Sequence, residues 1–170
     1  MDGVYGLKNF RNEIIWEYNT GGNTPKYFSR KHDNILFYTK TNNYTFNVQK
    51  EKVYVPSLAN RHSVIEKLGL FQDEEGKWCR MANCKDVWKI NALFRNSQEI
   101  VGYVTQKPKE LLERIIRASS NENDIIADFF CGSGTTGAVA KSMRRQYILC
   151  DINPRATEIS EERLNNIESN

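Results

Sequence analysis

The clearest pattern along the chain is a short apolar run followed by a glycine-rich turn and a helix. Residues 125–130 are apolar apart from Asp128, which predicts a strand buried on both faces, as in parallel sheets under helices. Gly132 and Gly134 follow, and glycine permits the positive φ angles that let a ligand approach the main chain. Thr135 and Thr136 then begin a predicted helix whose free N–H groups attract an acceptor.

A second short apolar run follows this helix and also ends in an acid. Residues 146–150 predict a neighbouring strand, and Asp151 stands at its end. An acid about twenty residues beyond the glycines, at the tip of the next strand, can accept hydrogen bonds from both hydroxyls of a ribose. The pattern therefore predicts an α/β unit that holds a nucleotide-type cofactor.

Two further strands are predicted near the N-terminus. Residues 13–18 and 34–39 are rich in β-branched and aromatic side chains. The polar loop 19–26 lies between them, so we expect the two strands to pair antiparallel. Its glycines and Lys26 make this loop a candidate DNA-facing element.

The middle of the chain mixes helical and strand patterns. Residues 57–68 predict a short helix that ends at Gly69. Its inward side chains are expected to be Val64, Ile65 and Leu68. Residues 70–80 predict a hairpin that turns at Glu75 and Gly76.

Two helices are predicted on either side of the glycine-rich turn. Pro108 suits the first turn of the earlier helix, where its missing N–H has no partner to lose. The apolar residues that recur on one face of this helix are Leu111, Leu112, Ile115 and Ile116. The opposite face offers the i,i+4 charge pairs Glu110–Arg114 and Glu113–Arg117. Asn153 and Pro154 predict the start of the later helix, which runs to about residue 167.

Composition narrows the class of protein. At 170 residues, with 39% hydrophobic and 26% charged residues, the chain has the size and balance of one soluble domain. It contains no apolar run of membrane-spanning length and no N-terminal signal pattern, so the expected location is cytoplasmic. The four cysteines form no C-x-x-C pair and only two histidines are present, so we expect reduced thiols and no metal site.

The net charge of +3 is small but unevenly distributed. Between residues 24 and 52 only Asp33 and Glu51 are acidic, whereas six residues are basic: Lys26, Arg30, Lys31, Lys40, Lys50 and Lys52. Six aromatic rings are interleaved with them: Tyr27, Phe28, Phe37, Tyr38, Tyr44 and Phe46. This composition suits nucleic-acid binding, because the cations can contact phosphates and the rings can stack on bases. A solvated strand pair with aromatic residues in its core has the same composition.

The glycine-rich segment also matches sequence motifs that are more specific than a general nucleotide-binding pattern. Gly132, Gly134 and Gly137 match the dinucleotide fingerprint GxGxxG, which alone is a weak signal. The longer stretch Asp128-Phe-Phe-Cys-Gly-Ser-Gly-Thr135 resembles the DxFxGxGT signature of the S-adenosylmethionine-dependent DNA amino-methyltransferases. Upstream, Thr105-Gln-Lys-Pro108 resembles the Thr-x-Lys-Pro segment of that family, which a dehydrogenase does not need. The resemblance runs from about residue 5 to the end and is weakest between residues 53 and 87.

The resemblance implies an α/β fold, a partial Rossmann-like methyltransferase domain. Its mixed sheet would contain the antiparallel strand pair and an inserted target-recognition region. We expect residues 1–52 to form the last strand pair with a DNA-facing loop, residues 53–100 the target-recognition region, and residues 101–170 the cofactor-binding part.

The family resemblance also assigns roles to individual residues. Asp151 would hold the ribose, Ile152 would lie against the adenine ring, and Asp128 would orient the loop or the methionine amino group. Phe130 is expected to pack under the loop. The full set expected around S-adenosylmethionine is Thr105, Lys107, Asp128, Phe130, Cys131, Gly132, Ser133, Gly134, Thr135, Asp151 and Ile152.

One motif of the family is absent from this sequence. The catalytic Asp/Asn-Pro-Pro-Tyr/Phe tetrapeptide precedes the cofactor loop in the arrangement that the chain resembles, and none of its four prolines is adjacent to another. We therefore assign no catalytic residue and expect the C-terminal portion of the enzyme, inactive without its catalytic half. The expected partners are double-stranded DNA and a second chain that carries the catalytic half or a restriction subunit.

The expected function is methyl transfer to the exocyclic amino group of adenine in a restriction–modification system. Cytosine amino-methylation, an inactive cofactor- or DNA-binding remnant and, on GxGxxG alone, a nucleotide-dependent oxidoreductase remain as alternatives. The residues expected to contact DNA are Lys26, Arg30, Lys31, Arg61, Lys77 and Arg80.

Overall fold

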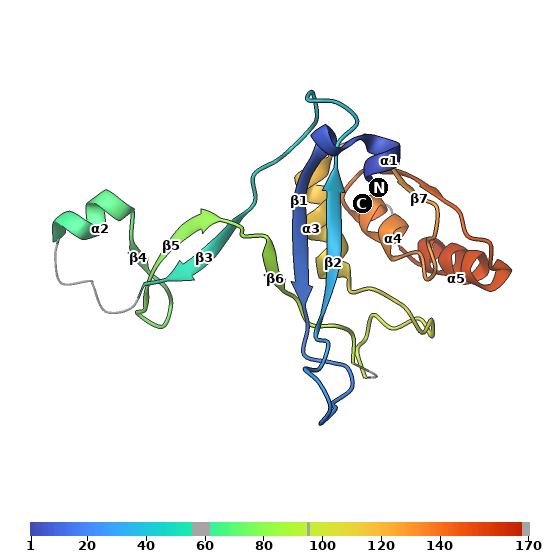
Figure 1. Ribbon diagram of the computed structural model, residues 1–170, viewed down its shortest axis with the longest axis horizontal. Helices are drawn as coiled ribbons and strands as arrows, with labels where there is room; N and C mark the ends of the chain where they lie inside the picture. The colour runs from blue at the N-terminus through green and yellow to red at the C-terminus, as the bar shows by residue number, and fades with distance from the viewer. Residues whose placement is uncertain (56–61, 95, 168–170) are drawn as a thin grey trace. The chain divides into compact units, whose positions relative to one another are not determined.

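The computed structural model describes residues 1–55, 62–94 and 96–167, and these divide into two compact units. The first unit combines Met1–Asn47 with Asp86–Asn170, and the second is Val48–Lys85 (Figure 1). The second unit overlaps the segment 53–100, whose role in target recognition stays a prediction.

A mixed sheet forms one half of the first unit. After the short α1 (Asp2–Tyr5) and η1 (Leu7–Asn9), β1 (Phe10–Glu17) pairs antiparallel with β2 (His32–Tyr38), which confirms the predicted pair (Figure 1). On its other side β1 pairs in parallel with β6 (Val87–Lys89). The strand order β2-β1-β6 therefore joins both chain segments of this unit.

The core beneath this sheet is built on aromatic residues and helix α3 (Lys109–Ser119). Trp16, Trp88, Ile90 and Leu111 are buried together, and the Trp16 indole N–H donates to the Ile90 carbonyl at 2.8 Å. The predicted apolar face of the helix is confirmed, since Leu111 and Ile116 are buried. Pro108 is the N-cap of this helix, one residue before its predicted place in the first turn.

The predicted charge pairs on α3 are replaced in part by another contact. The Arg114 guanidinium lies 5.3 Å from the centre of the Trp88 ring. A buried tryptophan face attracts a cation more strongly than an exposed glutamate one turn away, because the exposed pair is screened by water.

The second half of the first unit is a parallel pair of strands. β7 (Ile125–Asp128) pairs with β8 (Gln146–Leu149), and α4 (Thr135–Ser142) connects them. Val139 and Ala140 of α4 are buried with Ile116 of α3. Helix α5 (Pro154–Asn165) follows β8 and begins at Asn153, whose side chain accepts the Arg155 N–H, as predicted.

The predicted burial of β7 on both faces is wrong. Ile125 is 61% exposed, Phe129 62% and Phe130 88%, whereas Ile126 is half-buried. Burial on both faces needs a layer on each side of the sheet. Helix α4 supplies one such layer, and within the described residues β7 pairs with β8 alone.

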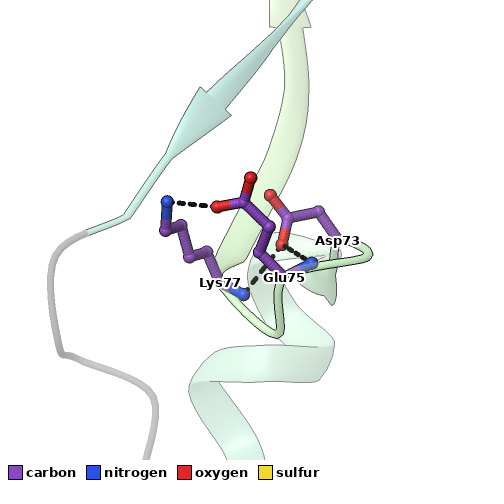
Figure 2. Close-up of polar contacts among 3 residues, drawn as sticks. All are labelled: Asp73, Glu75 and Lys77. Carbon is purple, nitrogen blue, oxygen red and sulfur yellow. Dashed lines mark hydrogen bonds and ion pairs between the residues drawn. The ribbon is translucent and has the colours of Figure 1, made fainter.

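The second unit contains a three-stranded antiparallel sheet and a short helix. The strand order is β3 (Lys50–Tyr54), β5 (Trp78–Asn83) and β4 (Phe71–Gln72). The predicted hairpin is confirmed: Asp73 accepts hydrogen bonds from the N–H groups of Glu75 and Lys77 at 3.0 and 2.9 Å, and this closes the turn (Figure 2).

Helix α2 (His62–Leu68) precedes that hairpin, and residues 56–61, which include the predicted helix start, lie outside the described residues. Leu68 is 44% exposed, so its predicted inward position is wrong. Gly69, with φ of +59°, turns the chain so that Leu70 takes the buried place instead.

Candidate cofactor site

The loop between β7 and α4 adopts the backbone geometry that its glycines predicted. Gly132 and Gly134 have φ angles of +51° and +68°. A Cβ atom at Gly132 would lie 3.1 Å from the Tyr103 ring, and one at Gly134 would lie 2.7 Å from the Ser160 hydroxyl. Both positions therefore need glycine for conformation and for space. We call residues 129–135 together with Asp151 the cofactor cradle.

Asp151 connects the end of β8 to this loop. Its Oδ2 accepts the Gly132 N–H at 2.8 Å, and its Oδ1 accepts the Asn153 N–H at 2.9 Å. Hydrogen bonds from these two amides lower the pKa of the Asp151 carboxyl. Each carboxylate oxygen keeps a second lone pair, so this ionised side chain can still accept hydroxyl hydrogens.

Asp128, at the end of β7, also accepts hydrogen bonds from the glycine-rich loop and from α4. Its Oδ1 accepts the Phe130 N–H at 3.0 Å, and its Oδ2 accepts the Thr136 hydroxyl at 2.6 Å. These bonds fix the loop to the first turn of α4. Asp128 is thus bonded to the loop on both of its carboxylate oxygens, and its contact with the methionine amino group stays a prediction.

Helix α5 supports the loop with two residues that the sequence analysis missed. The Ser160 hydroxyl donates to the Gly132 carbonyl at 3.0 Å. Arg163 donates from Nη1 to the Ser133 carbonyl at 3.1 Å and to the Thr135 hydroxyl at 2.8 Å. Ser160 and Arg163 lie on the buried face of α5 with Ala156. A basic residue at the apolar spacing of an amphipathic helix was the signal that could have identified Arg163.

Arg163 is a buried cation. Only 8% of its surface is exposed, and its Nη2 atom has no hydrogen-bond partner among the described residues. Burial lowers the pKa of the guanidinium, because water no longer stabilises the charge. The side chain is thus held under the loop with both N–H donors of Nη2 unused.

The segment before α3 lies against the same loop. The Lys107 carbonyl accepts the Thr135 hydroxyl at 3.2 Å, and Tyr103 packs at Gly132. The Lys107 ammonium lies 3.4 Å from Asp33 Oδ2 and 5.0 Å from the centre of the Trp16 ring. The structure therefore brings Lys107 to the cradle through its backbone, whereas its charge faces Asp33. Thr105 is exposed.

Two apolar side chains are exposed at the cradle, where β7 and β8 end: Phe130 within it and Ile152 next to Asp151. Phe130 is 88% exposed and Ile152 is 99% exposed. The expectation that Phe130 packs under the loop is wrong, because Cys131, which is 6% exposed beside Ser160, fills that place. Parallel strands end at the same edge of their sheet, so both side chains are available to a flat ring there.

The expected DNA-contacting residues are divided between the two units. Lys26 and Arg30 are exposed in the loop between β1 and β2, and the Lys31 ammonium donates to the Gly21 carbonyl at 2.8 Å. In the second unit Arg80 is exposed and Lys77 forms an ion pair with Glu75 (Figure 2). Arg61 lies outside the described residues.

Within residues 1–55, 62–94 and 96–167, no group of three or more potential metal ligands is present. Nor does that part of the chain contain a helix of sufficient length and apolar character to cross a membrane.

Comparison with known proteins decides the family. The N6/N4 methyltransferase family, described as DNA methylase, matches residues 3–162. The chain belongs to this DNA methylase family. Its fold agrees with that of the solved M1.HpyAVI–SAM complex, with a TM-score of 0.60 at 22% identity over 92% of this chain and 62% of that one.

Curated relatives of this DNA methylase family member are longer proteins. Type II methyltransferase M1.MboII of Moraxella bovis is 36% identical over 95% of this chain and 65% of its own length. DNA adenine methyltransferase YhdJ of Escherichia coli is 31% identical over 93% of this chain and 53% of its own length. The chain thus spans less than two thirds of either relative.

Proposed function

We propose that the chain binds S-adenosylmethionine in the cofactor cradle and serves methyl transfer to the exocyclic amino group of adenine in DNA. One observation carries the proposal: in a member of the DNA methylase family, Asp151 accepts the Gly132 amide at the mouth of a glycine-rich loop. The cofactor supplies an activated methyl group on sulfur. The protein then has to hold the two reactants in line and keep water away.

The residues of the cradle fit this cofactor. The second lone pairs of Asp151 can accept the ribose hydroxyls, and Phe130 and Ile152 offer apolar surface to the adenine ring. The two glycines let Tyr103 and Ser160 pack directly against the loop backbone, where a Cβ would crowd them, and their positive φ angles set the shape of the turn. The Lys107 ammonium has three donors, so it can contact a methionine carboxylate in addition to Asp33.

DNA is the proposed substrate of the same unit. Lys26 and Arg30 are exposed cations that can neutralise phosphates, and their loop leads into β2, the strand that carries Asp33, the partner of Lys107. Adenine as the methylated base is supported by the 31% identity to an adenine methyltransferase. We place the protein in a restriction–modification system on its relationship to M1.MboII, a type II methyltransferase.

A second chain is proposed to complete the enzyme. The family's catalytic tetrapeptide is absent from the sequence, and the β7–β8 pair leaves Ile125 and Ile148 61% and 49% exposed. Exposed apolar residues on a parallel pair favour a covering layer. We expect a polypeptide with an Asp-Pro-Pro-Tyr segment to pack on this surface.

A transfer assay tests the whole proposal. Tritiated methyl transfer to unmethylated DNA is measured with this chain alone, with a polypeptide that contains the Asp-Pro-Pro-Tyr half, and with both. We expect activity only in the mixture, and chromatography of the hydrolysed DNA should find the label on N6 of adenine. Label on N4 of cytosine would correct the base, and no transfer by a mixture shown to assemble would refute the function.

Point variants test the division of roles. Asp151→Ala and Gly132→Val should each lower the affinity for S-adenosylmethionine and leave DNA affinity intact. The first removes the acceptor of the Gly132 amide, and the second forces a branched side chain into a φ of +51° against Tyr103. Calorimetry measures the first affinity and fluorescence anisotropy the second. An equal loss of both would contradict separate sites.

A further inference from the structure

We propose that Phe28 and Tyr27, at the tip of the loop between β1 and β2, form an aromatic wedge that enters the base stack of DNA. Phe28 is 100% exposed and Tyr27 is 69% exposed. Single exposed apolar residues are common on protein surfaces, but two adjacent aromatic rings held in water are a candidate contact surface. The inference rests on the proposed DNA substrate and adds the element that disturbs its stacking.

Hydrogen bonds cross the loop between β1 and β2, although the aromatic side chains at its tip are exposed. The Lys31 ammonium donates to the Gly21 carbonyl at 2.8 Å, and the Ser29 hydroxyl donates to the Asn23 amide oxygen at 3.1 Å. At its base the Tyr18 N–H donates to the Lys31 carbonyl at 2.9 Å. These cross-loop bonds join the two arms below the aromatic pair. A wedge that is ordered before binding loses less conformational entropy when it inserts.

The same bonds change the role of Lys31. Its ammonium donates a hydrogen bond within the loop. We therefore assign the phosphate contacts to Lys26 and Arg30, the exposed cations that precede and follow the aromatic pair in the sequence. Residues 19–31 contain no acidic residue. A rim of positive charge around two rings complements a polyanion with stacked bases better than an apolar protein surface, and this favours DNA as the occupant.

The position of the loop connects the wedge to the chemistry. Asp33 of β2 holds Lys107, and the Lys107 carbonyl accepts the hydroxyl of Thr135 in the cradle. Methyl transfer to a base in a duplex requires that base to leave the stack. An aromatic ring that enters the stack occupies the gap left behind, which favours the extruded base.

The test uses the full chain and two duplexes of one sequence, one fully paired and one with a single abasic site. A wedge should favour the abasic duplex, because its gap is already open. We expect Phe28→Ala to reduce that preference at least about fivefold, the lower range for loss of one base–aromatic stack. Lys26→Ala should weaken binding of both duplexes equally and reduce the salt dependence.

A spectroscopic readout follows the ring directly. In Phe28→Trp the new indole should lose emission on DNA addition and become shielded from acrylamide. Val4→Trp provides the control, because Val4 is also exposed, at 81%, but lies in α1. Its indole should remain accessible. S-adenosylmethionine binding confirms that each variant is folded.

Three results would overturn the wedge. If Lys26→Ala weakens binding while Phe28→Ala keeps the abasic preference, DNA remains the substrate and the wedge is wrong. Shielding of the position-28 indole by the complementing polypeptide without DNA would assign the rings to a protein contact. Absence of DNA binding by the parent chain, alone and in the mixture, would refute the proposed substrate and the wedge together.

Discussion

Arg163 presents an unusual balance of forces at a single residue. Its guanidinium is buried, makes two hydrogen bonds from Nη1, and leaves Nη2 without a described partner. Removing a charge from water is costly, and an apolar residue of similar volume is often at least as stable. We therefore expect Arg163 to fix the geometry of the loop and to add little to the overall stability of the protein.

The variant Arg163→Met separates these two effects. We expect the affinity for S-adenosylmethionine to fall by about tenfold, or 1.4 kcal/mol, because the carbonyl of Ser133 loses a charged donor and the loop relaxes. The unfolding temperature should change little. Calorimetry and thermal unfolding measure the two quantities. A large fall in unfolding temperature with unchanged affinity would make Arg163 a purely structural residue.

The lowered pKa of Asp151 gives the cradle a defined pH dependence. The amides of Asn153 and Gly132 favour the ionised carboxylate, so the folded pKa lies below the unfolded one. Its contribution is fully present above the unfolded value, about 3.9, and is lost as the pH falls through the folded pKa. Carbon-13 NMR of the Asp151 carboxyl should give a midpoint below 3.9, the reference value for aspartate. A midpoint above that value would contradict these hydrogen bonds.

At the scale of elements, the hairpin of β4 and β5 depends on one acid. Asp73 accepts from the N–H groups of Glu75 and Lys77, while Glu75 adds only an exposed ion pair to Lys77 (Figure 2). Backbone bonds to a turn acid fix the chain, whereas exposed pairs contribute little. The lowered pKa of Asp73 has the Lys77 amide as its largest cause.

Asp73→Ala should therefore destabilise the second unit, and Glu75→Ala should be nearly neutral. Hydrogen exchange measures the difference: amides of β5 should exchange faster in Asp73→Ala, while those of α4 in the first unit keep their protection. Equal effects of the two substitutions would show that the ion pair, and not the turn acid, sets the hairpin.

The local sequence pattern predicted most helices, strands and turns, but not which elements pack against each other. The β1–β2 pair, the apolar face of α3, the hairpin and the glycine turn follow from signals within a few residues. The exposure of Phe130 could not be predicted from its own segment, since burial depends on which layers cover the sheet. The contact of Lys107 with Asp33 joins positions far apart in the sequence, and no local pattern specifies such a pair.

At the scale of the whole molecule, the cofactor cradle lies entirely within one unit. Its supporting residues Tyr103, Lys107, Ser160 and Arg163 all belong to the first unit. The second unit contributes Lys77 and Arg80, which are expected at the DNA. The proposed cofactor site and part of the proposed DNA surface therefore belong to different units.

Backbone hydrogen bonds anchor the first unit on both sides of the segment 48–85. Asn47 donates its backbone N–H to the Ala118 carbonyl at 2.7 Å, and the Asp86 carbonyl accepts the Ile15 N–H at 2.8 Å. Both bonds lie within the first unit. Replacement of residues 48–85 by a glycine–serine linker leaves these anchors in place.

This shortened chain should keep its affinity for S-adenosylmethionine within about twofold, because all the residues described above as holding the cradle remain in it. Its DNA affinity should fall, because Lys77 and Arg80 are removed. Calorimetry with the cofactor and anisotropy with duplex DNA measure the two outcomes. Asp151→Ala in the shortened chain is the control, and it should weaken cofactor binding as much as in the full chain. Loss of cofactor binding on deletion alone would mean that the second unit supports the cradle, and unchanged DNA affinity would remove that unit from the DNA surface.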